Sequence, residues 1–324
     1  MGFLKQIKMY GMENNYSLLS ICIPTFNRDY LIQECLRNIS PIIEKYNLHI
    51  YISDNASTDN TEMVIKEFQK NYSCITYQKQ EYNIGPDRNF EYVLKMSKSK
   101  YCWLLGDGCY IPEDSILSLL KDLEKREWDL YIVSDSENKR IRGNSIIYTN
   151  ATNLLENVGW HMTWLSSLIY NKKIINNMNY IRYYNSNFIQ TGIIFEYFIN
   201  HPCLVKVNPN IKVSSFNLQK KGHWLSIAFD IFCKNWYLFI MSLPIYYPFE
   251  SKIKCIKEHG IKSNLFSLIG LLSLREKGYL NFSICRRLNF FIKQTININF
   301  YLIVLISLTP KILISVIKYL AFKK

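Results

Sequence analysis

The feature that most constrains the fold is a regular alternation of short apolar runs and amphipathic segments from Leu18 to about Asn138. Helical spacing marks the segments between the runs; residues 30–45, for example, place Leu31, Cys35 and Ile39 on one face. Five strand-and-helix units in about 120 residues predict an α/β fold with a mostly parallel sheet flanked by helices. The five predicted strands are residues 18–26, 48–55, 74–79, 101–105 and 128–135.

Local signals set the expected helix starts. A capping pair of Asp59 and Glu62 predicts a helix that begins at Asp59, and Pro86 at a first helical position predicts another. After residue 140 the alternation fades, but a strand over 164–171 and a helix over 188–200 are expected. The predicted organisation is therefore an N-terminal extension (1–17), an α/β half (18–140), a second half (141–235) and a helical, basic C-terminal region (236–324).

Charge is distributed unevenly along the 324 residues, whose formal net charge is +13. Residues 1–138 hold 15 basic and 20 acidic side chains, a balance of −5, whereas residues 139–324 hold 24 and 6, a balance of +18. The basic residues are dispersed among long apolar runs, which argues against nucleic acid as a partner and favours an anionic membrane surface. Nine cysteines without a C-x-x-C pair indicate neither a disulfide framework nor a zinc site and fit a reducing cytoplasm.

The end of the chain is apolar but interrupted. The uninterrupted run from Phe300 to Pro310 is 11 residues long, against the roughly 20 that a spanning helix needs, and Pro310 and Lys311 break it. Two helices lying on a membrane surface are expected. The alternative is a helix pair packed on the rest of the chain or on a second copy in a homo-oligomer.

Polar and small residues follow the predicted strands at the edge where an open α/β sheet binds its ligand. Each group alone could serve a turn or a helix cap, but together they predict a ligand site. They are Pro24, Thr25, Asn27 and Arg28; Asp54, Asn55, Ser57 and Asp59; Gly85, Asp87, Arg88 and Asn89; Gly106, Asp107 and Cys109; and Asp135.

The residue types at this edge suit a nucleoside diphosphate. A carboxylate and an amide, such as Asp54 and Asn55, can read a base edge, the guanidinium of Arg88 suits phosphate, and Asp107 could hold a divalent ion between two phosphates. Neither G-x-G-x-x-G nor a P-loop motif occurs in the sequence. A nucleotide diphosphate bound without a P-loop is therefore expected.

Four of these segments resemble motifs of the inverting glycosyltransferases of family 2, which have the GT-A fold. They are "LLSICIPTFNR", "YISDNASTDNT", "NIGPDRN" and "YCWLLGDGC", and the resemblance covers about residues 18–138. The segments "GPDRNF" and "YCWLLG" are most similar to the abequosyltransferase-like branch, which glycosylates bacterial surface polysaccharides.

The resemblance implies a nucleotide-sugar donor, with a UDP-sugar favoured. It implies that Pro24, Thr25, Asn27 and Arg28 line the nucleotide, that Asp54 reads the base, and that Arg88 approaches the donor, with Asn55, Gly85 and Gly106 on the same edge. Asp107 would then be catalytic and belong to a metal motif that holds Mn²⁺ or Mg²⁺. Where the family has further acids, this sequence has Gly108 and Cys109, so the second ligand would be the soft thiol of Cys109.

The general base is expected in the acceptor-binding half, 141–235, where carboxylates are few. The candidates are Glu196, for which a solvated helix face is the favoured alternative, and His161, which could equally be packed beside Trp160 and Trp164. Members of this branch commonly use glycan or lipid-linked acceptors, which places the expected enzyme in the cytoplasm, peripheral on the inner face of the bacterial membrane. The alternative is a degenerate, non-catalytic relative that binds nucleotide sugar or scaffolds a partner.

Overall fold

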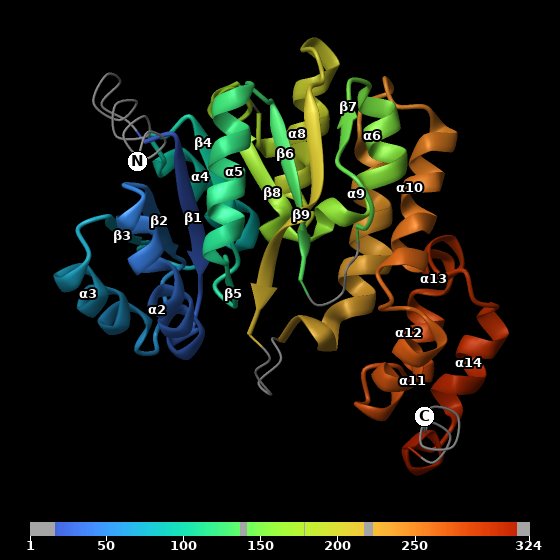
Figure 1. Ribbon diagram of the computed structural model, residues 1–324. Helices are drawn as coiled ribbons and strands as arrows, with labels where there is room; N and C mark the ends of the chain where they lie inside the picture. Colours follow the sequence, from blue (N-terminus) through green and yellow to red (C-terminus); the bar gives the residue numbers. More distant parts are fainter. Residues whose placement is uncertain (1–16, 137–140, 178, 217–222, 316–324) are drawn as a thin grey trace. The chain divides into compact units, whose positions relative to one another are not determined.

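The computed structural model describes residues 17–136, 141–177, 179–216 and 223–315 (Figure 1). The chain forms two compact units, the first made of residues 1–151, 162–185 and 189–217 and the second of residues 152–161, 186–188 and 218–324. Most of the predicted N-terminal extension, residues 1–16, and the last nine residues of the predicted membrane-associated tail lie outside the described residues.

The first unit is built on one mixed sheet with strand order β3-β2-β1-β4-β8-β6-β9-β5, and β7 pairs with β9. Neighbours from β3 to β4 are parallel, and β6 and β9 run in the same direction, whereas β8, β5 and β7 run in the opposite one. The five predicted strands are β1, β2, β3, β4 and β6, which confirms the mostly parallel α/β sheet. The strands are β1 (Leu19–Thr25), β2 (His49–Asp54), β3 (Ile75–Lys79), β4 (Tyr101–Leu104), β5 (Cys109–Tyr110), β6 (Leu130–Asp135), β7 (Ile146–Tyr148), β8 (Leu168–Asn171) and β9 (Val205–Ser215).

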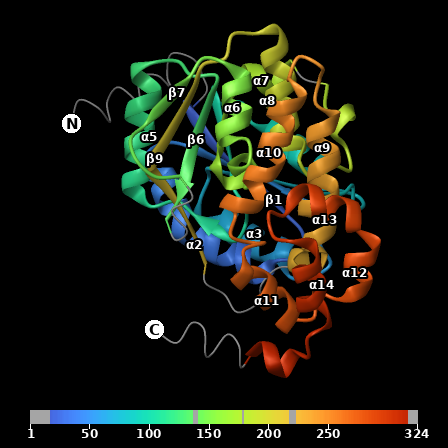
Figure 2. The ribbon, with the colours of Figure 1, turned by 90° about the vertical axis from the view of Figure 1, so that its right-hand side faces the viewer.

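Helices flank this sheet, as the apolar spacing predicts. The odd-numbered residues of β1, such as Ile21 and Ile23, form a buried cluster with Leu36 of α2, Ile65 of α3 and Leu119 of α5. Helix α4 packs on β1 and β2, and α5 packs beside β9 (Figure 2). The helices of this unit are α2 (Asp29–Lys45), α3 (Thr61–Asn71), α4 (Pro86–Met96), α5 (Glu113–Lys125), α7 (Lys172–Asn176) and α8 (Ile189–Asn200), and α6 (Ala151–Val158) begins at its boundary.

Two local predictions need correction and one is confirmed. Helix α3 begins at Thr61 instead of Asp59, because the Asp59 carboxylate accepts the Thr61 N–H while the Glu62 carboxylate pairs with lysines. The expected strand over 164–171 is shorter, because Leu165–Ser167 forms a 3₁₀ turn before β8. The helix expected over 188–200 is α8.

The second unit is helical, with its own apolar cluster that includes Phe229, Leu271 and Ile303. Its helices are α9 (Trp236–Ser242), α10 (Phe249–Lys262), α11 (Leu268–Glu276), α12 (Phe282–Arg287), α13 (Asn289–Thr295) and α14 (Phe300–Leu308), and α12 packs against both α13 and α14 (Figure 2). Helix α14 ends before Pro310, as expected. In the described part of the chain, every helix is too short or too polar to cross a bilayer.

Candidate nucleotide-binding site

The loops that follow β1 and β2 are hydrogen-bonded to each other at the carboxyl edge of the sheet. The Asn55 N–H donates to the Thr25 carbonyl at 2.9 Å, and the Asn27 N–H donates to Ser57 Oγ at 2.8 Å. In return, the Thr58 N–H donates to Asn27 Oδ1 at 2.8 Å. These contacts bring together two segments that the sequence places about 30 residues apart.

Two residues of these loops adopt left-handed backbone conformations, with φ 51° at Asn27 and φ 63° at Ala56. Asparagine tolerates this region, but alanine pays a steric cost of about 1 kcal/mol. Strained conformations persist only where surrounding contacts enforce them. The paired loops therefore adopt one defined conformation.

Asp54 orders the second loop. Its Oδ1 accepts the Ser57 N–H at 2.8 Å and its Oδ2 accepts the Tyr77 hydroxyl at 2.8 Å, while its side chain is fully buried. Burial, reinforced by the Asp54 carboxylate, raises the pKa of Tyr77 well above its ordinary value, so the hydroxyl remains a donor. The contact of Asp54 with a base stays a prediction.

The edge continues to the start of α4. Asn55 donates to Asn83 Oδ1 at 2.9 Å and accepts the Ile84 N–H at 2.8 Å, and the Gly85 N–H donates to Asn83 Oδ1 at 2.9 Å. Gly85 has φ 82°, which a glycine adopts without strain. The loops after β2 and β3 therefore also form one connected surface.

Arg88 lies in the first turn of α4 with an exposed side chain. Its guanidinium carbon is 4.7 Å from the ring centre of Tyr184, a cation–π contact. The Tyr184 hydroxyl donates to Glu91, and burial together with this carboxylate raises the pKa of Tyr184 to about 12. Tyr184 thus positions a guanidinium that can still reach an anion.

Asp107 lies at the end of β4 and is bonded to residues from the end of β1. Its Oδ2 accepts the Thr25 hydroxyl at 2.9 Å, and its Oδ1 accepts an Arg28 guanidinium N–H at 3.1 Å. The side chains are 8% exposed for Asp107 and 37% for Arg28. Burial raises the pKa of Asp107 even though Arg28 and Thr25 oppose the shift. Pro24, also predicted here, is buried inside β1.

Cys109 points into a small polar cluster. Its sulfur lies 3.5 Å from Ser166 Oγ and 3.6 Å from Ser215 Oγ, and Ser166 Oγ also accepts the Gly106 N–H at 3.0 Å. Burial raises the pKa of the Cys109 thiol, although the two serine hydroxyls oppose the shift. The role of Cys109 as a metal ligand stays a prediction.

These residues fit a divalent cation poorly. Mn²⁺ and Mg²⁺ prefer several oxygen ligands, and the segment 107–109 offers the single carboxylate of Asp107, both of whose oxygens already accept hydrogen bonds. Across residues 17–136, 141–177, 179–216 and 223–315, no group of three or more His, Cys, Asp and Glu side chains could hold a metal ion.

The two candidates for the general base have other contacts. Glu196, on α8, accepts the Tyr183 hydroxyl and pairs with Arg182 at 3.4 Å, which is typical of a structural ion pair. His161 belongs to the second unit, where its ring is fully buried and 5.4 Å from the ring of Trp160. This arrangement favours the packed alternative for His161.

Sequence analysis missed several residues of the edge. Asn83 is the first residue of the segment "NIGPDRN" but was not among the predicted site residues. Tyr77 shares a strand face with Ile75, which the β3 alternation indicates. The remaining three, Tyr184, Ser166 and Ser215, come from distant segments without a local signal.

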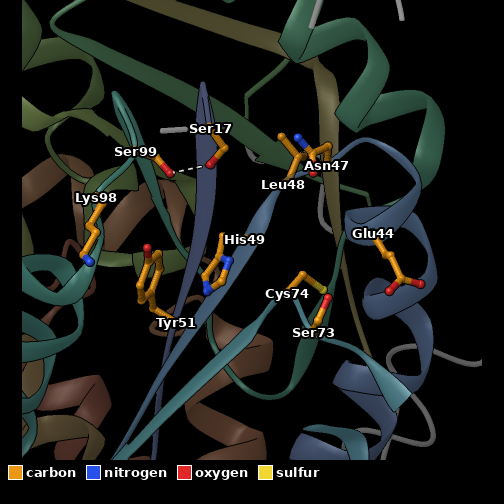
Figure 3. A pocket seen from close by; sticks show the side chains of 10 residues that line it. All are labelled: Ser17, Glu44, Asn47, Leu48, His49, Tyr51, Ser73, Cys74, Lys98 and Ser99. Carbon is orange, nitrogen blue, oxygen red and sulfur yellow. Dashed lines mark hydrogen bonds between the residues drawn. The ribbon is translucent and has the colours of Figure 1, made fainter. Parts of the chain in front are cut away.

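A separate cavity of about 320 Å³ lies at the amino ends of β1 to β4 (Figure 3). Its lining includes His49, Lys98 and Ser99, and Ser99 is hydrogen-bonded to Ser17 at 2.7 Å. It contains none of the predicted site residues and lies at the opposite ends of the strands.

The fold and the paired loops at its edge correspond to a known family. Residues 20–179 match the model of Glycosyl transferase family 2, and this segment of the chain belongs to that family. The match includes every strand-end residue described above except Tyr184 and Ser215.

Similar proteins agree with this assignment. The chain is 32% identical over 218 residues to abequosyltransferase RfbV of Salmonella typhimurium, which confirms the predicted branch. This alignment covers 66% of the chain and 56% of that protein, so the chain spans little more than half the length of this curated relative.

Solved structures confirm the GT-A-like fold. Residues 1–349 of S. aureus TarS in complex with UDP-GlcNAc superpose with a TM-score of 0.59 at 16% identity, covering 86% of this chain and 81% of that one. The mannosyltransferase PcManGT of Pyrobaculum calidifontis, in complex with GDP-Man and Mn²⁺, gives 0.54 at 12% identity, with 100% and 97% covered.

Proposed function

We propose that this protein is a glycosyltransferase that moves a sugar from a nucleotide-diphosphate sugar, with a UDP-sugar favoured, to a glycan or lipid-linked acceptor in bacterial surface polysaccharide synthesis. The observation that carries the proposal is the family match over residues 20–179, the segment that supplies the paired loops. UDP-GlcNAc in TarS and GDP-Man in PcManGT support a nucleotide-sugar donor for this fold.

The reaction is an inverting displacement at the anomeric carbon of the donor sugar. An acceptor hydroxyl oxygen forms the new bond while the bond from the sugar to the diphosphate oxygen breaks, and the hydroxyl proton passes to a base. The site must therefore stabilise the charge of the departing diphosphate. Arg28 and Arg88, both at the carboxyl edge, are the cations suited to this role.

The donor residues divide by role. Asp54 and Asn55 shape the base end of the edge by holding the loops after β2 and β3, and Thr25, Asn27, Gly85 and Gly106 contribute its backbone and small side chains. The expected cation, Mn²⁺ or Mg²⁺, would depend on Asp107. Acceptor binding is assigned to residues 141–235. Glu196 and His161 are the two candidates for the general base, and the acceptor experiments below distinguish them.

A membrane-surface location is supported by the second unit. Residues 218–324 hold 16 basic and 4 acidic side chains, a balance of +12. On α14, Tyr301, Leu302, Leu305 and Leu308 are exposed at helical spacing, whereas Ile303 and Ile306 are buried. An apolar stripe within a basic segment suits the surface of a bilayer with anionic lipids, which fits a peripheral enzyme on the cytoplasmic side.

A donor panel tests the activity. Purified full-length protein is given UDP-, GDP-, dTDP- and CDP-sugars, and release of the nucleotide is measured with and without glycan and polyprenyl-diphosphate-linked acceptors. Turnover of one donor class that increases when acceptor is added supports the proposal. The transfer rates of Glu196→Gln and His161→Asn then identify or exclude each residue as the general base. Absence of turnover with every combination would contradict it.

A non-catalytic relative is the second candidate, because one carboxylate stands where the family pattern has two or three. Such a protein would bind a nucleotide sugar without hydrolysing or transferring it. Binding of a donor that survives intact through long incubation with every acceptor would favour this candidate.

A further inference from the structure

We propose that the diphosphate of the donor is bound by the guanidinium of Arg28, positioned by Asp107, so that this protein binds nucleoside diphosphates without a divalent cation. This inference rests on the proposed function for the identity of the ligand. It assigns Asp107 as a positioning residue instead of a metal ligand.

The carboxylate of Asp107 already has two hydrogen-bond partners. One oxygen accepts the Thr25 hydroxyl at 2.9 Å and the other accepts the Arg28 guanidinium at 3.1 Å, and the side chain is only 8% exposed. A cation that bound to either oxygen would lie close to the guanidinium of Arg28, the positive charge that compensates this buried carboxylate.

The following positions add no oxygen ligand from a side chain. Gly108 has none, and the sulfur of Cys109 faces Ser166 and Ser215 at 3.5 and 3.6 Å. Crowding does not explain the glycine, because a Cβ at residue 108 would meet only Leu31 Cδ2, at an ordinary 3.9 Å. A Cβ at this position is therefore in ordinary contact with its surroundings.

Arg28 has the geometry of an anion-binding group. Its backbone N–H is fixed to Thr61 Oγ1 at 3.2 Å, and its side chain is 37% exposed at the carboxyl edge. A guanidinium carries five N–H donors, so the contact with Asp107 leaves others for phosphate oxygens in the bidentate pattern that arginine favours. Arg88, exposed at the same edge and stacked on Tyr184, supplies a second guanidinium.

Asp107 then has a clear role. By pairing with one end of the guanidinium it restricts the rotation of a long side chain, which lowers the entropy lost when phosphate binds. The Thr25 hydroxyl holds the carboxylate from the other side. The triad of Thr25, Asp107 and Arg28 thus presents one preorganised cation.

Calorimetric titration with UDP, GDP, CDP and dTDP tests the inference on the full-length protein, in EDTA and again with Mn²⁺ or Mg²⁺. We expect one nucleotide to bind in EDTA with an affinity within about threefold of that with metal, since a direct charge-assisted contact needs no ion. Arg28→Ala should weaken binding in EDTA at least about tenfold. The matched control is Arg37→Ala, which removes an exposed arginine of α2, the helix that begins directly after Arg28. Arg37 is paired with Glu34, and its loss should leave the affinity unchanged.

Two further variants probe Asp107 and the missing acid. Asp107→Asn keeps an oxygen acceptor for Arg28 and should retain more nucleotide affinity in EDTA than Asp107→Ala; equal losses would contradict a positioning role. Gly108→Asp adds a carboxylate next to Asp107 and should make binding respond to Mn²⁺ where the wild type does not.

The outcomes separate this inference from the proposed function. Wild-type binding that needs Mn²⁺, with Arg28→Ala unaffected, overturns the inference while donor turnover leaves the function intact. Nucleotide binding in EDTA without turnover of any donor supports the inference and refutes the proposed transferase activity. Absence of nucleotide binding under both conditions, with native circular dichroism, refutes both.

Discussion

The hydrogen bond from Tyr77 to Asp54 offers a direct test of how the nucleotide edge is held. Tyr77→Phe removes one hydroxyl and changes nothing else in the side chain. The hydroxyl donates at 2.8 Å to a carboxylate with no exposed surface, whose other oxygen accepts the Ser57 N–H. The variant therefore leaves a buried charge with one donor fewer.

Hydrogen bonds to charged groups contribute about 1.5–3 kcal/mol, and the full burial of Asp54 places this one in that range. With a urea m-value of about 3 kcal/mol per molar, Tyr77→Phe should lower the unfolding midpoint of the first unit by about 0.5–1 M. Because Asp54 also orders the loop that contains Ser57, the affinity for the bound nucleotide should fall in the same variant.

Urea unfolding followed by circular dichroism and tryptophan fluorescence measures the stability change, and calorimetry measures the affinity. Tyr82→Phe is the matched control, because it makes the same chemical change on a ring that is 65% exposed, and its midpoint should match the wild type. If Tyr77→Phe and Tyr82→Phe unfold at the same urea concentration, the reasoning that Asp54 depends on this hydroxyl is refuted.

Three other substitutions have expected outcomes. Ala56→Gly should relieve the left-handed strain and, after the entropy cost of glycine, stabilise the protein by about 0.5 kcal/mol in urea unfolding; a loss above about 1 kcal/mol would be inconsistent with strain. Glu127→Gln should destabilise by less than about 1 kcal/mol near pH 7, because the two lysines that lower the Glu127 pKa to about 2 act on a side chain that is 45% exposed. Since that pKa is lowered, its stabilisation is complete above the ordinary carboxyl pKa and disappears as the pH falls towards 2, so the unfolding midpoints of variant and wild type should converge in acid and not in base. Leu305→Asp, on the exposed stripe of α14, should weaken flotation with anionic vesicles about tenfold or more. Ile181→Asp, at a site of the first unit that is at least as exposed, should not; equal retention of both variants by the vesicles would exclude α14 from the membrane contact.

The part of the fold that the sequence predicts is the part whose signals are local. The strand over 128–135 and the helix that Pro86 opens can each be recognised from a few adjacent residues, and both are present as β6 and α4. By contrast, β8 inserts antiparallel between β4 and β6, and its short run after a 3₁₀ turn carries no sign of that place in the sheet.

The candidate site divides in the same way. Asp54, Arg88 and Asp107 follow predicted strands and lie at one edge because parallel strands end together. The alternation of β3 indicates the face on which Tyr77 lies, but not its hydrogen bond to Asp54. Tyr184, which contacts Arg88, and Ser215, which contacts Cys109, come from distant segments and could not be predicted. The predicted capping pair failed for a related reason, because Glu62 found lysine partners instead of its own helix terminus.

The paired loops after β1 and β2 have a consequence for how this protein can change. Asn27 and Ser57 hold each other, so a substitution at either would disturb both loops at once. Phe26 and Tyr30, on the same stretch, are 40% and 52% exposed and contribute no side chain to that pairing. Mutational drift can therefore alter these outward residues without refolding the paired loops.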